Sequence, residues 1–182
     1  MRRILLALSL LALAAPAGAA GAAGDEPSTV ADCANPALPS EILKHAPAKT
    51  VAPLEVIDAT GAAKPLRLAV ADDTPTRELG LMCVTGLRPQ HGMLFVFTQA
   101  SLQPFWMKNT LIALDMVWLD GDGTVTAVAA DVPASTRSTP NAAVARRSGT
   151  GRFVIELASG EARADGIVTG LRLALPALHA SP

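Results

Sequence analysis

The run "GMLFVF", Gly92 to Phe97, limits the folds open to this chain more than any other segment. Its large apolar residues are consecutive, so an extended segment here would need cover on both faces. The run is also too short and too aromatic for a typical helix. We therefore predict a strand at the centre of the core, buried on both sides.

Shorter strand patterns surround this run. "LEVID" and "KPLRLAVAD" are separated by the turn-forming Ala59-Thr60-Gly61, which predicts a hairpin. "ALDMVWL" and "TVTAVAADV" are joined by "DGDG", which predicts a second hairpin, and "RFVIELASG" adds a further strand. The fold class expected is mainly β (α+β): a compact antiparallel sheet or barrel with one or two short helices.

Two segments are predicted to be helical. In "DDTPTRELGLM", Thr74 suits the N-cap and Pro75 the first helical position, while Leu79, Met82 and Cys83 would form the apolar side. "EARADGI" would form a single helical turn.

Two further segments are not expected to be regular. Phe105 to Leu119 is long for one strand, so we expect a bend at Asn109-Thr110 that separates "PFWMKN" from "ALDMVWL". Pro133 to Gly151 has no clear period and is predicted to be a long loop, a candidate lid.

The N-terminal sequence predicts export. Arg2 and Arg3 precede an apolar run, and small residues follow, so residues 1–19 are interpreted as a signal peptide. The run is too short to span a bilayer, and no stable membrane insertion is expected. Residues 20–51 would be a flexible leader and 52–178 a single β-rich domain. The expected location is periplasmic or secreted.

Charge and cysteine content constrain partners and redox state. Without Arg2 and Arg3, 13 basic residues face 16 acidic ones, so nucleic acid is not an expected partner. In an oxidising compartment Cys33 and Cys83 could pair, which would stabilise the fold by about 4 kcal/mol. The alternative is a buried thiol at Cys83 and an incidental one at Cys33.

Asp115 is the most unusual residue of the candidate site because its neighbours are apolar. A buried carboxylate needs donors, and we expect them from the Asn109-Thr110 bend or from Lys108 or Arg77. Alternatively, Asp115 lines a pocket in which Trp106 gives an apolar plate beside polar groups. The candidate ligand-binding residues are Trp106, Lys108, Asn109, Thr110, Asp115, Arg77 and Glu78.

The favoured function is a non-catalytic ligand-binding or accessory module, whose partner is a small polar ligand or an envelope protein. No catalytic residue, metal or cofactor is predicted, because phosphate-binding loops, nucleophile elbows and zinc spacings are missing from the sequence. One alternative is a hydrolase-like enzyme with Asp115 or Glu78 as base and Lys108 and Asn109 stabilising charge.

Copper binding is a second alternative, because thioether sulfur is a preferred ligand of Cu(I). Methionines are also common core residues, so this pattern does not require a metal. The ligands would be Met82, Met93, Met107, Met116 and His91.

Four segments together resemble domain-of-unknown-function family 192: "TRELGLM", "GMLFVF", "FWMKNTLIALDMVWLDGDGTV" and "FVIELASGEARADGI". The resemblance covers roughly Leu54 to Leu175. It implies a compact, often exported β-rich domain with no established activity. The family pattern falls on Arg77, Glu78, Gly80, Leu81, Met82, Gly92, Met93, Leu94, Phe95, Phe105, Trp106, Met107, Lys108, Asn109, Thr110 and Asp115. Ala113 departs from it, since a proline is common there.

Overall fold

The computed structural model describes residues 52–57, 63–175 and 178. The predicted signal peptide and leader, and with them Cys33, lie outside the described residues. Side chains are described from Lys64 onward.

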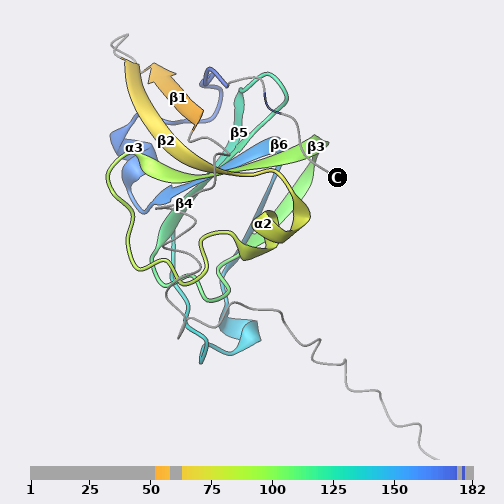
Figure 1. The fold of residues 1–182 in the computed structure, drawn as a ribbon, viewed down its shortest axis with the longest axis vertical. Helices are drawn as coiled ribbons and strands as arrows, with labels where there is room; N and C mark the ends of the chain where they lie inside the picture. Colours follow the sequence, from red (N-terminus) through yellow and green to blue (C-terminus); the bar gives the residue numbers. More distant parts are fainter. Residues whose placement is uncertain (1–51, 58–62, 176–177, 179–182) are drawn as a thin grey trace, which may run out of the picture.

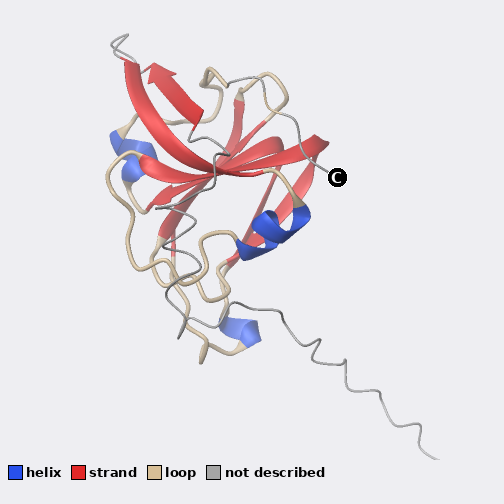
Figure 2. Cartoon of the chain, in the orientation of Figure 1, coloured by secondary structure: helices blue, strands red, loops and turns tan. Residues whose placement is uncertain are grey.

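The described chain is mainly β, as predicted, with short helices (Figures 1 and 2). Six strands form one sheet in the order β1-β2-β3-β6-β4-β5. The strands are β1 (Ala52–Ile57), β2 (Ala63–Ala71), β3 (His91–Trp106), β4 (Leu114–Leu119), β5 (Val125–Val132) and β6 (Arg146–Ala158). The helices are α2 (Thr74–Leu79), the 3-10 helix η1 (Asn141–Ala143) and α3 (Glu161–Ala164).

The sheet is mixed and open, which corrects two details of the prediction. The predicted hairpins are present as the antiparallel pairs β1–β2 and β4–β5. However, β2 pairs with β3 in parallel, through a connection that contains α2. Within the described residues β1 and β5 are the two outer strands of the sheet, so the barrel alternative was wrong.

Strand β3 is longer than the sequence suggested. It continues from "GMLFVF" through Phe105 and Trp106, and its register with β6 shifts between Val96 and Ser101. The segments "GMLFVF" and "PFW" therefore belong to one strand, which ends shortly before the predicted bend at Asn109-Thr110. Strand β6 is also longer, because it begins at Arg146. The predicted loop from Pro133 to Gly151 is thus partly strand, and its irregular part ends before β6.

Helix α2 begins and ends earlier than predicted. Its N-cap is Asp73, whose side chain accepts a hydrogen bond of 2.9 Å from the Thr76 backbone N–H. The helix ends at Leu79, and its C-cap is Gly80, where φ is +49°, a conformation that glycine adopts readily. Met82 and Cys83 therefore lie in the turns after α2, not on its apolar side as predicted.

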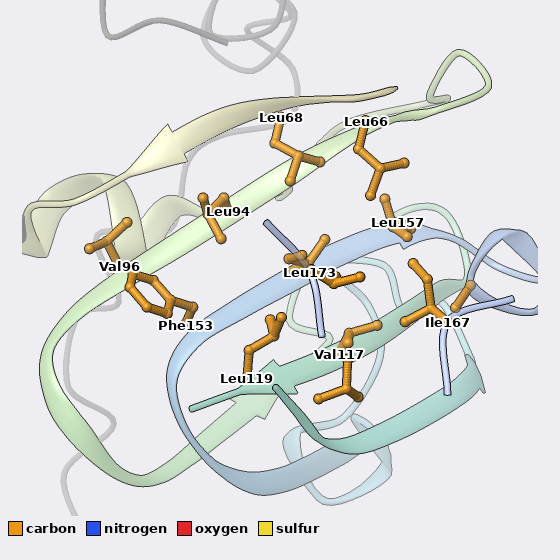
Figure 3. Close-up of a cluster of buried hydrophobic side chains, with 13 residues drawn as sticks. Leu66, Leu68, Leu94, Val96, Val117, Leu119, Phe153, Leu157, Ile167 and Leu173 are labelled. Atoms are coloured by element: carbon orange, nitrogen blue, oxygen red, sulfur yellow. The ribbon is translucent and has the colours of Figure 1, made fainter. Parts of the chain in front are cut away.

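Hydrophobic residues cover both faces of the central strands, as the "GMLFVF" run predicted. Leu94 and Val96 of β3 belong to one cluster, while Met93 and Phe95 belong to the other. Figure 3 shows the first cluster, in which leucine, valine and phenylalanine side chains from β2, β3, β4 and β6 lie around Leu173. Because successive residues of a strand point to opposite faces, any polar residue in the middle of these strands must lie in one of the two clusters.

No helix in the described part of the chain is both long and apolar enough to cross a membrane.

Candidate functional site

A tight bend follows β3, as predicted, and several backbone hydrogen bonds fix it. The Thr110 N–H donates to Met107 O at 3.1 Å, and Asn109 has a φ of +51°, which asparagine tolerates better than most residues. Cys83 N–H donates to Asn109 O at 2.9 Å, and Ser135 N–H donates to Thr110 O at 2.8 Å. The bend is therefore held against the segment after α2 and the segment after β5.

A cleft lies between this bend, the end of α2 and the sheet. Its cavity volume is about 30 Å³. That is room for about one or two water molecules and far below the usual range for drug-sized ligands, so the cleft suits only a very small group, such as the polar end of a ligand that extends through the opening. Its lining residues are Arg77, Glu78, Leu79, Gly80, Leu81, Met82, Phe95, Phe105, Trp106, Thr110 and Glu156.

Glu156 is the buried polar residue of this cleft. It lies in β6, and in the sheet register it stands opposite Met93 of β3 on one side and Met116 of β4 on the other. Cross-strand partners share a face, so the Glu156 side chain lies between two buried methionines. Only 4% of Glu156 is exposed, and burial is the one cause of its raised pKa, with no contribution from a hydrogen bond. Its carboxyl oxygens are not among the fully enclosed, unpartnered atoms of the described chain, so they reach the open space of the cleft.

This environment disfavours the charged form of Glu156. Burial raises the pKa of its carboxyl group from an ordinary value of 4.5 to about 8. At neutral pH the free protein therefore holds Glu156 mostly protonated. A ligand could therefore give this carboxyl group the hydrogen-bond partner or the positive charge that the described chain does not provide.

Arg77 also lines the cleft, but its guanidinium is used to hold α2 against β3. It donates to the backbone oxygens of Asp72 at 2.7 Å and Val96 at 3.0 Å, and to Thr74 Oγ1 at 3.1 Å. Its charged end lies 5.6 Å from the centre of the Phe97 ring. Arg77 therefore has a clear structural role, whereas its neighbour Glu78 is exposed at the cleft.

Aromatic rings form the wall beside β3. Phe105 packs edge-on against Phe95, with ring centroids 4.9 Å apart. Trp106 is 43% exposed, and the Arg146 guanidinium lies 5.8 Å from the centre of its ring. The cleft thus combines a fixed aromatic wall with a buried carboxyl group.

Asp115 lies on the opposite face of the sheet from Glu156. It accepts hydrogen bonds from the backbone N–H groups of Asp131 at 2.9 Å and Ala162 at 3.0 Å. Asp115 is fully buried and does not line the cleft. The prediction that it is hydrogen-bonded is confirmed, but the expected donors were wrong: Asp115 joins β4 to β5 and α3, not to the bend.

Lys108 and Asn109 do not line the cleft either. The Lys108 ammonium donates to Asn141 Oδ1 in η1. Asn109 is fully buried, and neither polar atom of its side chain has a hydrogen-bond partner in the described part of the chain. The structure therefore brings together Arg77, Glu78, Trp106 and Thr110 from the predicted set and separates them from Lys108, Asn109 and Asp115.

The four methionines of the copper hypothesis lie in the core or at the cleft. Met93, Met107 and Met116 belong to the second hydrophobic cluster, and Met82 lines the cleft. His91 is at the start of β3, where its Nδ1 lies 2.9 Å from Pro89 O. Among the described residues no group of three or more His, Cys, Asp or Glu side chains could hold a metal ion.

Glu156 was missed by the sequence analysis. In "RFVIELASG" it occupies one alternate position of a strand, which is normally a solvent-facing position. The signal that could have found it is the one that drew attention to Asp115, a single carboxylate with large apolar residues on both sides.

Comparison with known proteins supports the family. The model of DUF192, described as Uncharacterized ACR, matches residues 55–175. The chain belongs to the DUF192 family. No match was found among curated proteins.

Two solved structures share the fold. One, titled a putative transcription regulator (R01717) from Sinorhizobium meliloti 1021, is 31% identical, with a TM-score of 0.58, and the match covers 68% of this chain and 92% of that one. The other, titled a protein of unknown function from Novosphingobium aromaticivorans DSM 12444, is 27% identical, with a TM-score of 0.56 and coverage of 68% and 84%.

Proposed function

We propose that this DUF192 chain is an exported, non-catalytic module that binds a small polar ligand in the Glu156 cleft. The observation that carries the proposal is the Glu156 carboxyl group, which is buried at the cleft without a donor from the described chain. Polar groups in such apolar surroundings are normally hydrogen-bonded. A ligand that pairs with Glu156 would give this carboxyl group a partner that the described chain does not.

The motifs that carry the family resemblance supply most of the cleft. "TRELGLM" contributes the residues around the end of α2, and "FWMKNT" contributes Phe105, Trp106 and Thr110. Hydrogen bonds hold both motifs in place. Arg77 ties "TRELGLM" to β3, and the backbone hydrogen bonds of the Asn109-Thr110 bend hold "FWMKNT". A binding site built on such rigid supports needs little ordering when the ligand arrives.

The hydrolase alternative is less well supported. It requires Asp115 or Glu78 near Lys108 and Asn109, whereas Asp115 lies on the other face of the sheet with two backbone donors. Export through the predicted signal peptide and a Cys33–Cys83 disulfide remain part of the proposal, since both suit an envelope location.

The two tryptophans offer a direct test by nuclear magnetic resonance. Trp106 lines the cleft, whereas Trp118 is buried and its indole N–H donates to Gln103 O at 3.1 Å. In a screen of small polar molecules at different pH values, a cleft ligand should shift the ¹⁵N-indole signal of Trp106 much more than that of Trp118. Glu156→Gln should weaken this response. A screen in which no compound moves the Trp106 signal would contradict the proposal.

Calorimetry with Trp106→Ala gives a second test. Binding of the compound found in the screen should be lost while the melting temperature stays nearly unchanged, because Trp106 is partly exposed. Leu102→Ala is the matched control, since Leu102 is 66% exposed on the same strand and does not line the cleft. Unfolding of Trp106→Ala, or unchanged binding by it, would count against the cleft.

A further inference from the structure

We infer that the ligand of this cleft is a small primary ammonium ion, bound by the Glu156 carboxylate. The inference rests on the proposed ligand-binding function and adds the chemical class of the ligand.

The hydrogen-bonding groups of the cleft favour a ligand with N–H donors. Two carboxyl groups line it, Glu156 in the interior and Glu78 at the exposed side. Two guanidinium groups lie beside them, and that of Arg146 already donates to Asn141 O at 3.1 Å. Arg77 already donates to two backbone oxygens and one hydroxyl, so its charge is directed at the junction of α2 and β3. A primary ammonium brings three N–H donors, which match a lining that offers acceptors.

The aromatic wall favours the same class of ligand. Faces of tryptophan and phenylalanine rings attract cations, and more strongly where water is excluded. The Trp106 ring already makes such a contact with the Arg146 guanidinium, 5.8 Å from its centre, so a ligand cation would have to share this ring with Arg146. Phe105, held edge-on by Phe95, offers a second aromatic ring to the alkyl part of an amine.

Binding would be linked to proton release. An ammonium ion pairs with ionised Glu156, but burial raises the pKa of this carboxyl group to about 8, so most molecules must lose a proton on binding. The ionised fraction rises about fiftyfold between about pH 6 and pH 8, and the affinity should rise with it. The other charged groups near the cleft are Arg77, Glu78 and Arg146. A neutral ligand that accepts a hydrogen bond from protonated Glu156 would show the opposite trend.

Three probes of equal chain length separate charge from shape: butylammonium, butan-1-ol and butyrate. Each is titrated into the full-length exported protein in amine-free phosphate buffer, and the Trp106 and Trp118 indole signals are followed. Butylammonium should give a saturable shift of Trp106, with a Kd about fiftyfold lower at about pH 8 than at about pH 6. The alcohol and the carboxylate should bind at least tenfold more weakly.

Two matched variants test the role of the carboxylate. Glu156→Gln keeps the size of the side chain but removes the charge, so butylammonium binding should be lost, while an unchanged Trp118 signal reports an intact fold. Glu161→Gln makes the same change outside the cleft and should leave binding intact, because a glutamine oxygen can still accept from the Gln90 N–H.

The possible failures are distinguishable. Preferred binding of butan-1-ol or butyrate, an affinity for butylammonium that falls as pH rises, or retained binding by Glu156→Gln would overturn the ammonium assignment. If the screen of polar molecules gives a cleft ligand and butylammonium does not bind, the assignment alone is wrong. If neither the screen nor the three probes shifts Trp106, the ligand-binding function is wrong as well.

Discussion

Replacing Glu156 by glutamine should change how stability depends on pH. In the folded protein burial raises the pKa of Glu156 from 4.5 to about 8. The folded state therefore binds more protons than the unfolded state between these values, and Glu156 lowers stability as pH rises through this window. Each unit of pKa difference corresponds to about 1.4 kcal/mol, so the loss between about pH 5 and pH 8 is about 3.5 kcal/mol. Glutamine does not titrate and removes this loss.

Urea unfolding of the unmodified protein and of Glu156→Gln at about pH 5 and about pH 8 measures the effect. Subtracting one free energy of unfolding from the other at each pH cancels the contribution of the other titrating groups. At about pH 5 the titration of Glu156 should contribute little to the difference between the two free energies of unfolding. Between about pH 5 and about pH 8, the free energy of unfolding of the variant should rise by about 3.5 kcal/mol relative to that of the unmodified protein. Parallel pH profiles would refute the reasoning, because they would mean that Glu156 is as well solvated in the folded state as in the unfolded one.

Three further predictions concern the fold. Asp115→Ala should lower the free energy of unfolding by about 2 to 6 kcal/mol in urea unfolding, because it leaves two backbone N–H donors without their acceptor; a loss below about 1 kcal/mol would contradict this. Gly92→Ala should destabilise the protein strongly, since its Cβ would lie 2.1 Å from Glu156 O, whereas Gly86→Ala meets nothing within 4 Å; equal melting temperatures would be the contrary result. Denaturing mass spectrometry without reductant should give a mass about 2 Da below that of the reduced chain if Cys33 and Cys83 pair, and reduction should then cost about 4 kcal/mol; an unchanged mass would disprove the bridge.

Local sequence patterns predicted the strands but not their pairing. The alternation in "KPLRLAVAD" and the apolar run "GMLFVF" each identify a strand, because burial on one or both faces leaves a local signature. The parallel pairing of β2 with β3 has no such signature, since it depends on how α2 returns the chain along the sheet. The extension of β3 to Trp106 and of β6 back to Arg146 likewise depends on their pairing with each other.

The two buried carboxylates illustrate the same limit within the site. Asp115 was predicted to be buried and hydrogen-bonded because apolar residues surround it in the sequence. Its donors, Asp131 and Ala162, are distant in the sequence and could not be identified before the sheet was assembled. Glu156 was not singled out, because only the assembled sheet shows that both faces of β6 are covered. Trp106 and Thr110, which line the cleft, could be singled out because an aromatic residue and a turn residue have local signatures.

Direct titration of the Glu156 carboxyl group tests the central claim most closely. With ¹³C-labelled glutamate and Glu156→Gln to assign the signal, the side-chain carboxyl resonance is followed against pH in the free protein and with butylammonium. The midpoint should lie near 8 in the free protein, as burial requires, and should fall when the ligand is added. A midpoint near 4.5 in both samples would show a hydrated carboxyl group that no ligand reaches, and would contradict the proposed site.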